Sequence, residues 1–426
     1  MLRSMFSGVS GLRAHQTMMD VIGNNIANVN TIGYKSSSVV FQDMLSQVLS
    51  GAGVPTAGPG GLGGTNPSQV GLGVKIGGIT TSFRQGASQL TGNSTDMSIQ
   101  GDGFLIARNS GQTLFTRAGA LSFDALGRMV TPDGGVIQGW TADTAGVVNT
   151  NASTGDLQMP LGQAISPQAT TKLSIGGNLN AEVPTTLPGA EVFTSITVYD
   201  TLGKALDLTF GMKMTAANTW SVQPYTPDGA DVDTAPDTLG AAFNLTFDAT
   251  TGKITAPLTP PTVTIPGTFG TFPGPVTIDF GTTAPDGLRQ FAGKTTASAL
   301  SQDGATTGAL QTFSLGADGS VTGVFSNGRN RVIGQIAMAS FSNPSGLEKV
   351  GGSFYRPTPN SGLAQIGVSG TGGRGSIAGG TLEMSNVDLA QEFTSLIASQ
   401  RGFQANSRVI TTADELLQEL VNLKRG

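Results

Sequence analysis

The sequence predicts a mainly β protein of the α+β class, with a helix at each end and β-rich domains between them. Both terminal segments repeat apolar residues every seven positions, whereas the middle alternates apolar and polar residues around turns that contain Asp and Gly. Glycine and proline, 62 and 21 of 426 residues, make up about a fifth of the chain, which is typical of turn-rich β structure. We expect the two helices to pair as a coiled-coil-like inner domain.

Composition excludes several classes of function. The chain has no cysteine, which rules out disulfides, thiolate metal sites and thiol nucleophiles. Its net charge of −5 gives no basic surface for nucleic acid or anionic lipid, and no apolar run reaches the length of a membrane span. Ser and Gly interrupt the first residues, MLRSMFSGVSGLRAHQ, so we expect export without a cleaved signal peptide, or a cytosolic protein. We expect no cofactor, no nucleic acid partner and no membrane partner.

The first helix is predicted over residues 1–30. Its apolar stripe has a seven-residue spacing and consists of Met5, Leu12, Met19 and Ile26. The helix is expected to stop within NNIANVNTIGYK (24–35), because asparagine hydrogen-bonds its own backbone and glycine accepts a positive φ.

The last helix is predicted over residues 383–426. Its seven-residue series, with one supporting aromatic residue, consists of Leu389, Phe393, Leu396, Phe403, Ile410 and Leu417. Asn386 or Asp388 can cap its start, and Lys424 and Arg425 suit its negative end. About 40 residues at roughly 1.5 Å each give a helix near 60 Å, about twice the diameter of a small domain. Such a helix needs neighbours.

The second position of each heptad is poorly suited to a two-helix seam. That position is expected to hold Gln16 and Gly23 in the first helix, and Gln400, Ser407 and Asp414 in the last. A short, flawed pairing is marginal in one chain and becomes firm when other helices surround it. The alternative, an ordinary terminal helix packed on its own core, stays open on periodicity alone.

One turn pattern recurs between the helices. The four copies are FDALGRMV (123–130), YDTLGKAL (199–206), FDATTGKIT (247–255) and LGADGSVT (315–322). Each has Asp early, Gly late and alternating apolar residues on both sides, which predicts a β-hairpin.

These patterns divide the chain into four parts. The predicted parts are a terminal helical assembly domain (1–30 and 383–426), a Gly/Pro-rich connector (31–70), a split β domain (71–157 and 300–382) and an outer β domain (158–299). If the terminal helices lie together, the chain runs out and back. The outer β domain is then an insertion into the inner one.

Motifs that suggest chemistry are weak on inspection. His15, the only histidine, has no partner histidine for a metal, and no serine–histidine–aspartate arrangement is local to it. GTGGRG (370–375) matches a dinucleotide-binding pattern, but SIAGGTLE follows it instead of a helix. The aspartates within PDGADVDTAPD (227–237) lack the glycine and terminal glutamate of a calcium loop. We therefore expect no catalytic residue, no metal site and no enzyme.

Four segments carry a family resemblance. ANVNTIGYK (27–35), GDGFLIARNSGQTLFTRAGALSFDALGRMVTPDG (101–134), residues 334–362 and residues 382–425 resemble, in order, segments of the bacterial flagellar rod and hook axial proteins. The residues that carry the first motif are Asn28, Thr31, Gly33, Tyr34 and Lys35. Rod subunits lack the inserted β region, so the resemblance points to the hook branch. The middle region, 158–299, is similar more loosely.

The resemblance implies a function. Hook subunits polymerise into a curved, flexible extracellular tube that passes torque from rod to filament as a universal joint. The implied partners are other copies of the chain, the rod, the hook cap, the hook–filament junction proteins and the type III export apparatus. The terminal helices are expected to line the tube. A distal rod protein, a secreted β-rich adhesin and a secreted enzyme on a β scaffold are the alternatives.

Overall fold

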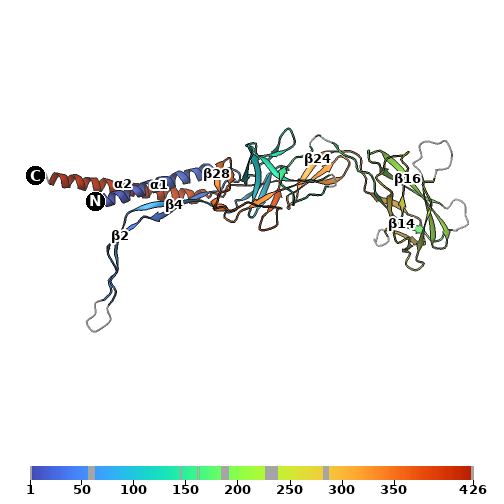
Figure 1. The fold of residues 1–426 in the computed structure, drawn as a ribbon, viewed down its shortest axis with the longest axis horizontal. Helices are drawn as coiled ribbons and strands as arrows, with labels where there is room; N and C mark the ends of the chain where they lie inside the picture. Colours follow the sequence, from blue (N-terminus) through green and yellow to red (C-terminus); the bar gives the residue numbers. More distant parts are fainter. Residues whose placement is uncertain are drawn as a thin grey trace. The chain divides into compact units, whose positions relative to one another are not determined.

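A computed structural model describes residues 2–55, 63–143, 146–160, 162, 164–183, 191–225, 238–281 and 287–423 of the chain. These residues form two compact units, both visible in Figure 1. The first unit contains Met1–Met159, Phe313–Thr322 and Val332–Gly426, and the second contains Pro160–Thr312 and Gly323–Arg331. The first unit is therefore built from both ends of the chain.

Two helices, α1 (Leu2–Ala27) and α2 (Leu389–Leu423), lie side by side in the first unit (Figure 1). This confirms the predicted helical ends. The carboxylate of Asp388 caps α2, since its Oδ1 accepts the backbone N–H of Ala390 at 2.9 Å and that of Gln391 at 3.2 Å. The basic pair expected at the end of α2, residues 424 and 425, lies outside the described residues.

A two-stranded ribbon follows α1, where the sequence predicted a connector over 31–70. Strand β1 (Ser37–Asp43) pairs antiparallel with β4 (Val74–Thr81), and β2 (Ser46–Ser50) pairs with β3 (Ser68–Gly71). β1 and β2 fall within the predicted connector, where no strand was expected, whereas β4 falls within the predicted split β domain. The ribbon runs along α1 and then departs from it (Figure 1).

The rest of the first unit is mainly sheet, with its strands in the order β26-β11-β7-β8-β29-β28. The strands of this unit and its one short helix are β5 (Ser88–Leu90), β6 (Met97–Gln100), β7 (Phe104–Asn109), β8 (Gln112–Thr116), β9 (Ser122–Phe123), β10 (Met129–Val130), β11 (Val136–Thr141), β12 (Gly155–Asp156), β26 (Asn330–Ile336), β27 (Met338–Ser340), η1 (Pro344–Gly346), β28 (Glu348–Gly351), β29 (Phe354–Arg356), β30 (Gln365–Gly367), β31 (Ser376–Gly379) and β32 (Thr381–Glu383). Its core is aromatic: the rings of Phe115 and Phe341 meet edge to face with centroids 4.8 Å apart. The sheet gives the helix pair a rigid base.

The second unit holds two five-stranded sheets. Its strands, of which β24 and β25 continue into the first unit, are β13 (Ala164–Ile165), β14 (Lys172–Asn180), β15 (Val192–Tyr199), β16 (Ala205–Ala216), β17 (Thr219–Tyr225), β18 (Phe243–Phe247), β19 (Ile254–Ala256), β20 (Thr262–Val263), β21 (Val276–Asp279), β22 (Leu288–Phe291), β23 (Ser298–Gln302), β24 (Gly308–Leu315) and β25 (Ser320–Phe325). Its core surrounds the fully buried Trp220. The predicted outer domain, 158–299, lies almost wholly in this unit, which continues to Thr312.

All four predicted hairpins are confirmed: the turns join β9 to β10, β15 to β16, β18 to β19 and β24 to β25. In each turn the Oδ1 of the Asp accepts the backbone N–H of the residue two positions later. The Oδ1 of Asp200, for example, accepts the backbone N–H of Leu202 at 2.9 Å and that of Lys204 at 2.8 Å, while Gly203 takes a φ of +81°.

Candidate assembly surface

The first helix ends in a cluster of asparagine hydrogen bonds. The side-chain amide of Asn28 donates to the backbone oxygen of Asn24 at 2.9 Å and to its Oδ1 at 2.6 Å, and Thr31 Oγ1 donates to Asn28 Oδ1 at 3.0 Å. Gly33 then takes a φ of +68°, where a Cβ would lie 2.7 Å from the backbone nitrogen of Ala118. The motif thus stops the helix and turns the chain onto the sheet.

Lys35, the last residue of the motif, enters a buried ion group. Its ammonium lies 2.5 Å from Oε1 of Glu383, and Nη1 of Arg117 lies 3.6 Å from the other carboxylate oxygen. The three side chains are at most 2% exposed. Burial lowers the pKa of Lys35 from its ordinary value of 10.5, while the neighbouring Glu383 opposes that shift. This group joins the end of α1 to the segment that leads into α2.

Asn25 fixes the same junction from the helix side. Its Nδ2 donates to the backbone oxygen of Ser37 at 2.8 Å and to Oε1 of Glu392 at 3.0 Å, and its Oδ1 accepts the hydroxyl of Tyr34 at 3.2 Å. One buried amide therefore connects α1, α2, the ribbon and the motif. Burial raises the pKa of Glu392, and the amide hydrogen bond opposes this effect.

The two helices run antiparallel through a seam of small and polar side chains. Gly8 faces Ile410, Gly11 faces Asn406 and His15 faces Gly402; a Cβ on Gly8 would lie 3.1 Å from Cγ1 of Ile410. The hydroxyl of Ser399 donates to the backbone oxygen of His15 at 3.0 Å. Four of the α2 residues in the seam repeat every seven positions: Glu392, Ser399, Asn406 and Ala413. The helices can approach closely because glycine carries no side chain.

The predicted stripe residues flank this seam. Met5, Leu12, Met19 and Ile26 on α1 are half-buried, as are Leu396, Phe403, Ile410 and Leu417 on α2. The companion positions expected from the sequence were wrong, because Gln16, Gly23, Gln400, Ser407 and Asp414 are exposed. The seven-residue period was correct, but the positions that pack between the two helices are the small and polar residues of the seam.

Other apolar side chains on the pair face solvent. Phe6 on α1 is 70% exposed, and Phe393 and Ile397, one turn apart on α2, are 49% and 59% exposed. Leu389, also in the predicted stripe, is exposed one turn before Phe393. Leu389, Phe393 and Ile397 form a second apolar stripe on α2 that the described part of the chain leaves uncovered.

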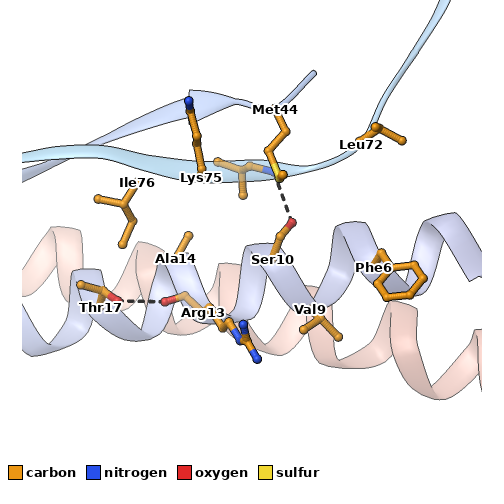
Figure 2. Close-up of a pocket in the computed structure, with 11 residues that line it drawn as sticks. Phe6, Val9, Ser10, Arg13, Ala14, Thr17, Met44, Leu72, Lys75 and Ile76 are labelled. Carbon is orange, nitrogen blue, oxygen red and sulfur yellow. Dashed lines mark hydrogen bonds between the residues drawn. The ribbon is translucent and has the colours of Figure 1, made fainter. Parts of the chain in front are cut away.

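A groove lies between α1 and the ribbon (Figure 2). It holds about 450 Å³ and is lined on α1 by Phe6 and Val9 and on the ribbon by Met44, Leu72 and Ile76. Figure 2 shows where the ribbon touches α1: the backbone N–H of Val74 donates to Ser10 Oγ at 3.2 Å.

Sequence reasoning missed the residues that hold this region together. The helical glycines were a usable signal, since glycine inside a helix costs about 1 kcal/mol relative to alanine and is kept for a packing reason. Lys35 and Glu383 are separated by 348 positions, and no local pattern relates them. The role of Glu383 and Arg117 becomes visible only in the folded chain, where both lie in the ion group with Lys35.

The structure describes two of the three features that were considered for chemistry, His15 and GTGGRG. His15 lies in the helix seam with its ring against Phe41, centroids 5.5 Å apart. GTGGRG (370–375) forms a glycine-rich loop ahead of β31, and the aspartates of 228–237 lie outside the described residues. Among the residues that the structure describes, no three His, Cys, Asp or Glu side chains gather in a way that could hold a metal ion. Within those residues, neither helix has an apolar stretch suited to crossing a membrane.

Comparisons with known proteins point in one direction. Four family models match: "Flagella basal body rod protein" (5–35), "Flagellar hook protein FlgE/F/G D1 domain" (98–181), "Flagellar basal body protein FlaE D2 domain" (178–305) and "Flagellar basal body rod FlgEFG protein C-terminal" (378–423). The chain is 41% identical to the flagellar hook protein FlgE of Treponema pallidum, and 40% identical to that of Borreliella burgdorferi, over the whole of each chain.

A solved structure shares the fold. The crystal structure of the flagellar hook protein FlgE2 of Helicobacter pylori matches 70% of this chain and 100% of its own, with a TM-score of 0.52 and 16% identity. At that identity the likeness bears on the fold alone.

Proposed function

Since this chain belongs to the flagellar hook protein family and is a structural subunit of the bacterial flagellar hook, we propose that its antiparallel helix pair joins copies of the chain into the wall of the tube. The hook is part of the extracellular flagellum, and its subunits assemble with one another. The proposal concerns which residues of this chain make that assembly.

One observation carries the proposal: apolar side chains of the helix pair face solvent. Phe6, Phe393 and Ile397 stand on helices whose other faces pack within the chain. Complete burial of such a side chain contributes roughly 1.5–3 kcal/mol. Contacts with several neighbouring copies repeat that contribution at every subunit, whereas a single chain leaves it unused.

The family motif has a supporting role in this proposal. Lys35, Glu383 and Arg117 fix the base of both helices to the sheet, so that every copy presents its stripe in the same orientation. Asn28, Thr31, Gly33 and Tyr34 set the turn that leads to this anchor. We assign these residues to positioning the helices, and the helix stripes to contacts between copies.

The proposal extends to partners and mechanics. The rod, the hook cap and the hook–filament junction proteins would meet the same tube, and the type III export apparatus would deliver the chain. The second unit would carry torque through weak, sliding contacts between copies, since its sequence is rich in Gly and Thr and poor in charge. The assignment includes no catalytic step. The alternatives of a rod protein, an adhesin or an enzyme fit the hook relatives less well.

Electron microscopy of the purified chain at rising concentration tests the assignment. We expect hollow tubes from the full chain and none from a chain that ends at Glu383, before α2. Soluble monomers of the full chain at every concentration, or tubes from the truncated chain, would overturn it.

A further inference from the structure

The end of α2 projects beyond the start of α1. Gly8 faces Ile410, so six residues of α1 remain before its start at Leu2, while thirteen residues of α2 remain before its end at Leu423. At about 1.5 Å per residue, α2 continues roughly 10 Å past α1. Figure 1 shows the C-terminal end of the pair extending past the N-terminal end. This overhang has no α1 residue beside it.

The end of α2, residues 413–423, which includes the seven-residue overhang 417–423, carries both apolar and acidic side chains. Leu416 and Val421 are 54% and 57% exposed and lie on different faces of the helix, about 140° apart. Segment 413–423 contains Asp414, Glu415 and Glu419 and no Lys or Arg. Among the described residues, neither Glu415 nor Glu419 forms an ion pair. The two glutamates lie one turn apart, on one flank of Leu416.

The groove between α1 and the ribbon is also apolar, but it carries the opposite charge. Its walls are apolar, and the charged residues that line it are both basic: Arg13 on α1 and Lys75 on β4. Figure 2 shows them on opposite sides of the groove. Both side chains are exposed, and within the described part of the chain neither forms a salt bridge. At about 450 Å³, the groove falls within the roughly 300–1,000 Å³ typical of ligand pockets.

We propose that this groove receives the end of α2, residues 413–423, of a second copy of the chain. Leu416 would enter between Phe6, Val9 and Leu72, and the two glutamates on its flank would meet the basic rim. The same chain cannot supply this overhang, because its own α2 is held in the seam on α1 by Gly8 and Gly11 and projects past the end of α1.

The contact is heterologous, since one surface of a copy meets a different surface of the next. Such contacts do not close on a pair and generate rings or helical arrays. The inference rests on the proposed assembly function and deepens it by naming the segment and its receptor. Reversing the charge on one side would place like charges together, which costs several kcal/mol when they are close.

Charge reversal on each side tests the inference in the full chain. The groove variant carries Arg13→Glu with Lys75→Glu, and the overhang variant carries Glu415→Lys with Glu419→Lys. We expect each alone to need about tenfold more protein, or higher, to form tubes, since tenfold corresponds to about 1.4 kcal/mol. An equimolar mixture of the two variants should recover assembly, because an alternating array pairs every reversed groove with a reversed overhang.

Three further measurements make the result decisive. Lys213→Glu with Lys253→Glu, two exposed residues of the second unit, changes the net charge as much as the groove variant does and should assemble like the unaltered chain. Thermal unfolding of each variant should match that of the unaltered chain. Failure of the mixture, together with recovery when all four changes share one chain, would place the contact within a chain and overturn the inference.

The remaining outcomes separate the two proposals. If both reversed variants assemble as readily as the unaltered chain, the docking inference is wrong and the assembly function stands. If the unaltered chain forms no tubes, the assembly function fails and the docking inference falls with it.

Discussion

Gly402 of α2 faces His15 of α1 so closely that a Cβ on Gly402 would lie 2.5 Å from both Cε1 and Nε2 of the imidazole. The ring is held on its other side by Phe41 of the ribbon. The two helices therefore meet at a point where a hydrogen atom fits and a methyl group does not.

Gly402→Val should separate the helices locally. We expect the overpacked seam to lose about 1–3 kcal/mol, more than valine gains over glycine in helix propensity. Gly23→Val is the matched control, because a Cβ on Gly23 meets nothing within 4 Å. Hydrogen exchange of the α1 and α2 amides measures the effect. Equal protection in both variants would show that the seam tolerates side chains.

The helices and turns were predictable because their signals are local. A period of seven, an Asp388 cap and Asp–Gly turns each occupy a few consecutive residues. The seam between the helices was not predictable, because a search for apolar periodicity passes over glycine, serine and asparagine. These residues let the two helices approach closely. The ribbon was missed because its paired strands lie on either side of the Gly- and Pro-rich residues 51–68, and β1 and β4 also rest on α1.

Glu383→Gln should strongly destabilise the first unit. The substitution leaves Lys35 and Arg117 buried without a carboxylate, and breaking a buried pair in this way costs about 3–5 kcal/mol. Glu348→Gln is the control, since its pair with Arg356 is half exposed and contributes about 0–1 kcal/mol. Calorimetric unfolding of the full chain compares the two. Similar transitions for both variants would contradict an anchoring role for the buried group.

The turn at Asp248 should respond to acid. Hydrogen bonds from the hydroxyl of Thr250 and from the backbone N–H groups of Thr250 and Thr251 hold the pKa of Asp248 at about 2, below its ordinary 3.8. Between about pH 2 and pH 3.8, the folded turn therefore binds fewer protons than the unfolded chain. Its contribution to stability is complete above pH 3.8 and is lost as the pH falls towards 2.

Carbon-13 NMR of the Asp248 carboxyl measures its midpoint directly. We expect a midpoint near 2 in the unaltered chain and a higher one after Thr250→Ala, which removes the hydroxyl donor. A midpoint of 3.8 or above in the unaltered chain would show that these hydrogen bonds do not favour the carboxylate.

The second unit should be removable without loss of the tube. Gln168 and Ala305 exchange backbone hydrogen bonds of 2.9 and 2.8 Å, so their strands can be joined after deletion of 169–304 by an Asn-Gly turn. We expect the shortened chain to fold and assemble, with tubes that are abnormally straight or break easily under the microscope. Failure of the first unit to fold would show that it depends on the deleted residues.

Phe393→Asp and Ile397→Asp test the central claim, that the uncovered stripe of α2 joins one copy to the next. Both side chains are exposed in the single chain, so the melting temperature of the monomer should stay within a degree or two of the unaltered value, as surface changes usually allow. In a tube each change would bury an unpaired carboxylate at every subunit, costing several kcal/mol.

Gln404→Asp, at an exposed polar position of the same helix, is the control. The deciding measurement is the fraction of protein in tubes, by electron microscopy and sedimentation, beside the monomer melting temperature for all three variants. The account predicts unchanged melting throughout, tubes from Gln404→Asp, and none from Phe393→Asp or Ile397→Asp. Normal tubes from either stripe variant would contradict it.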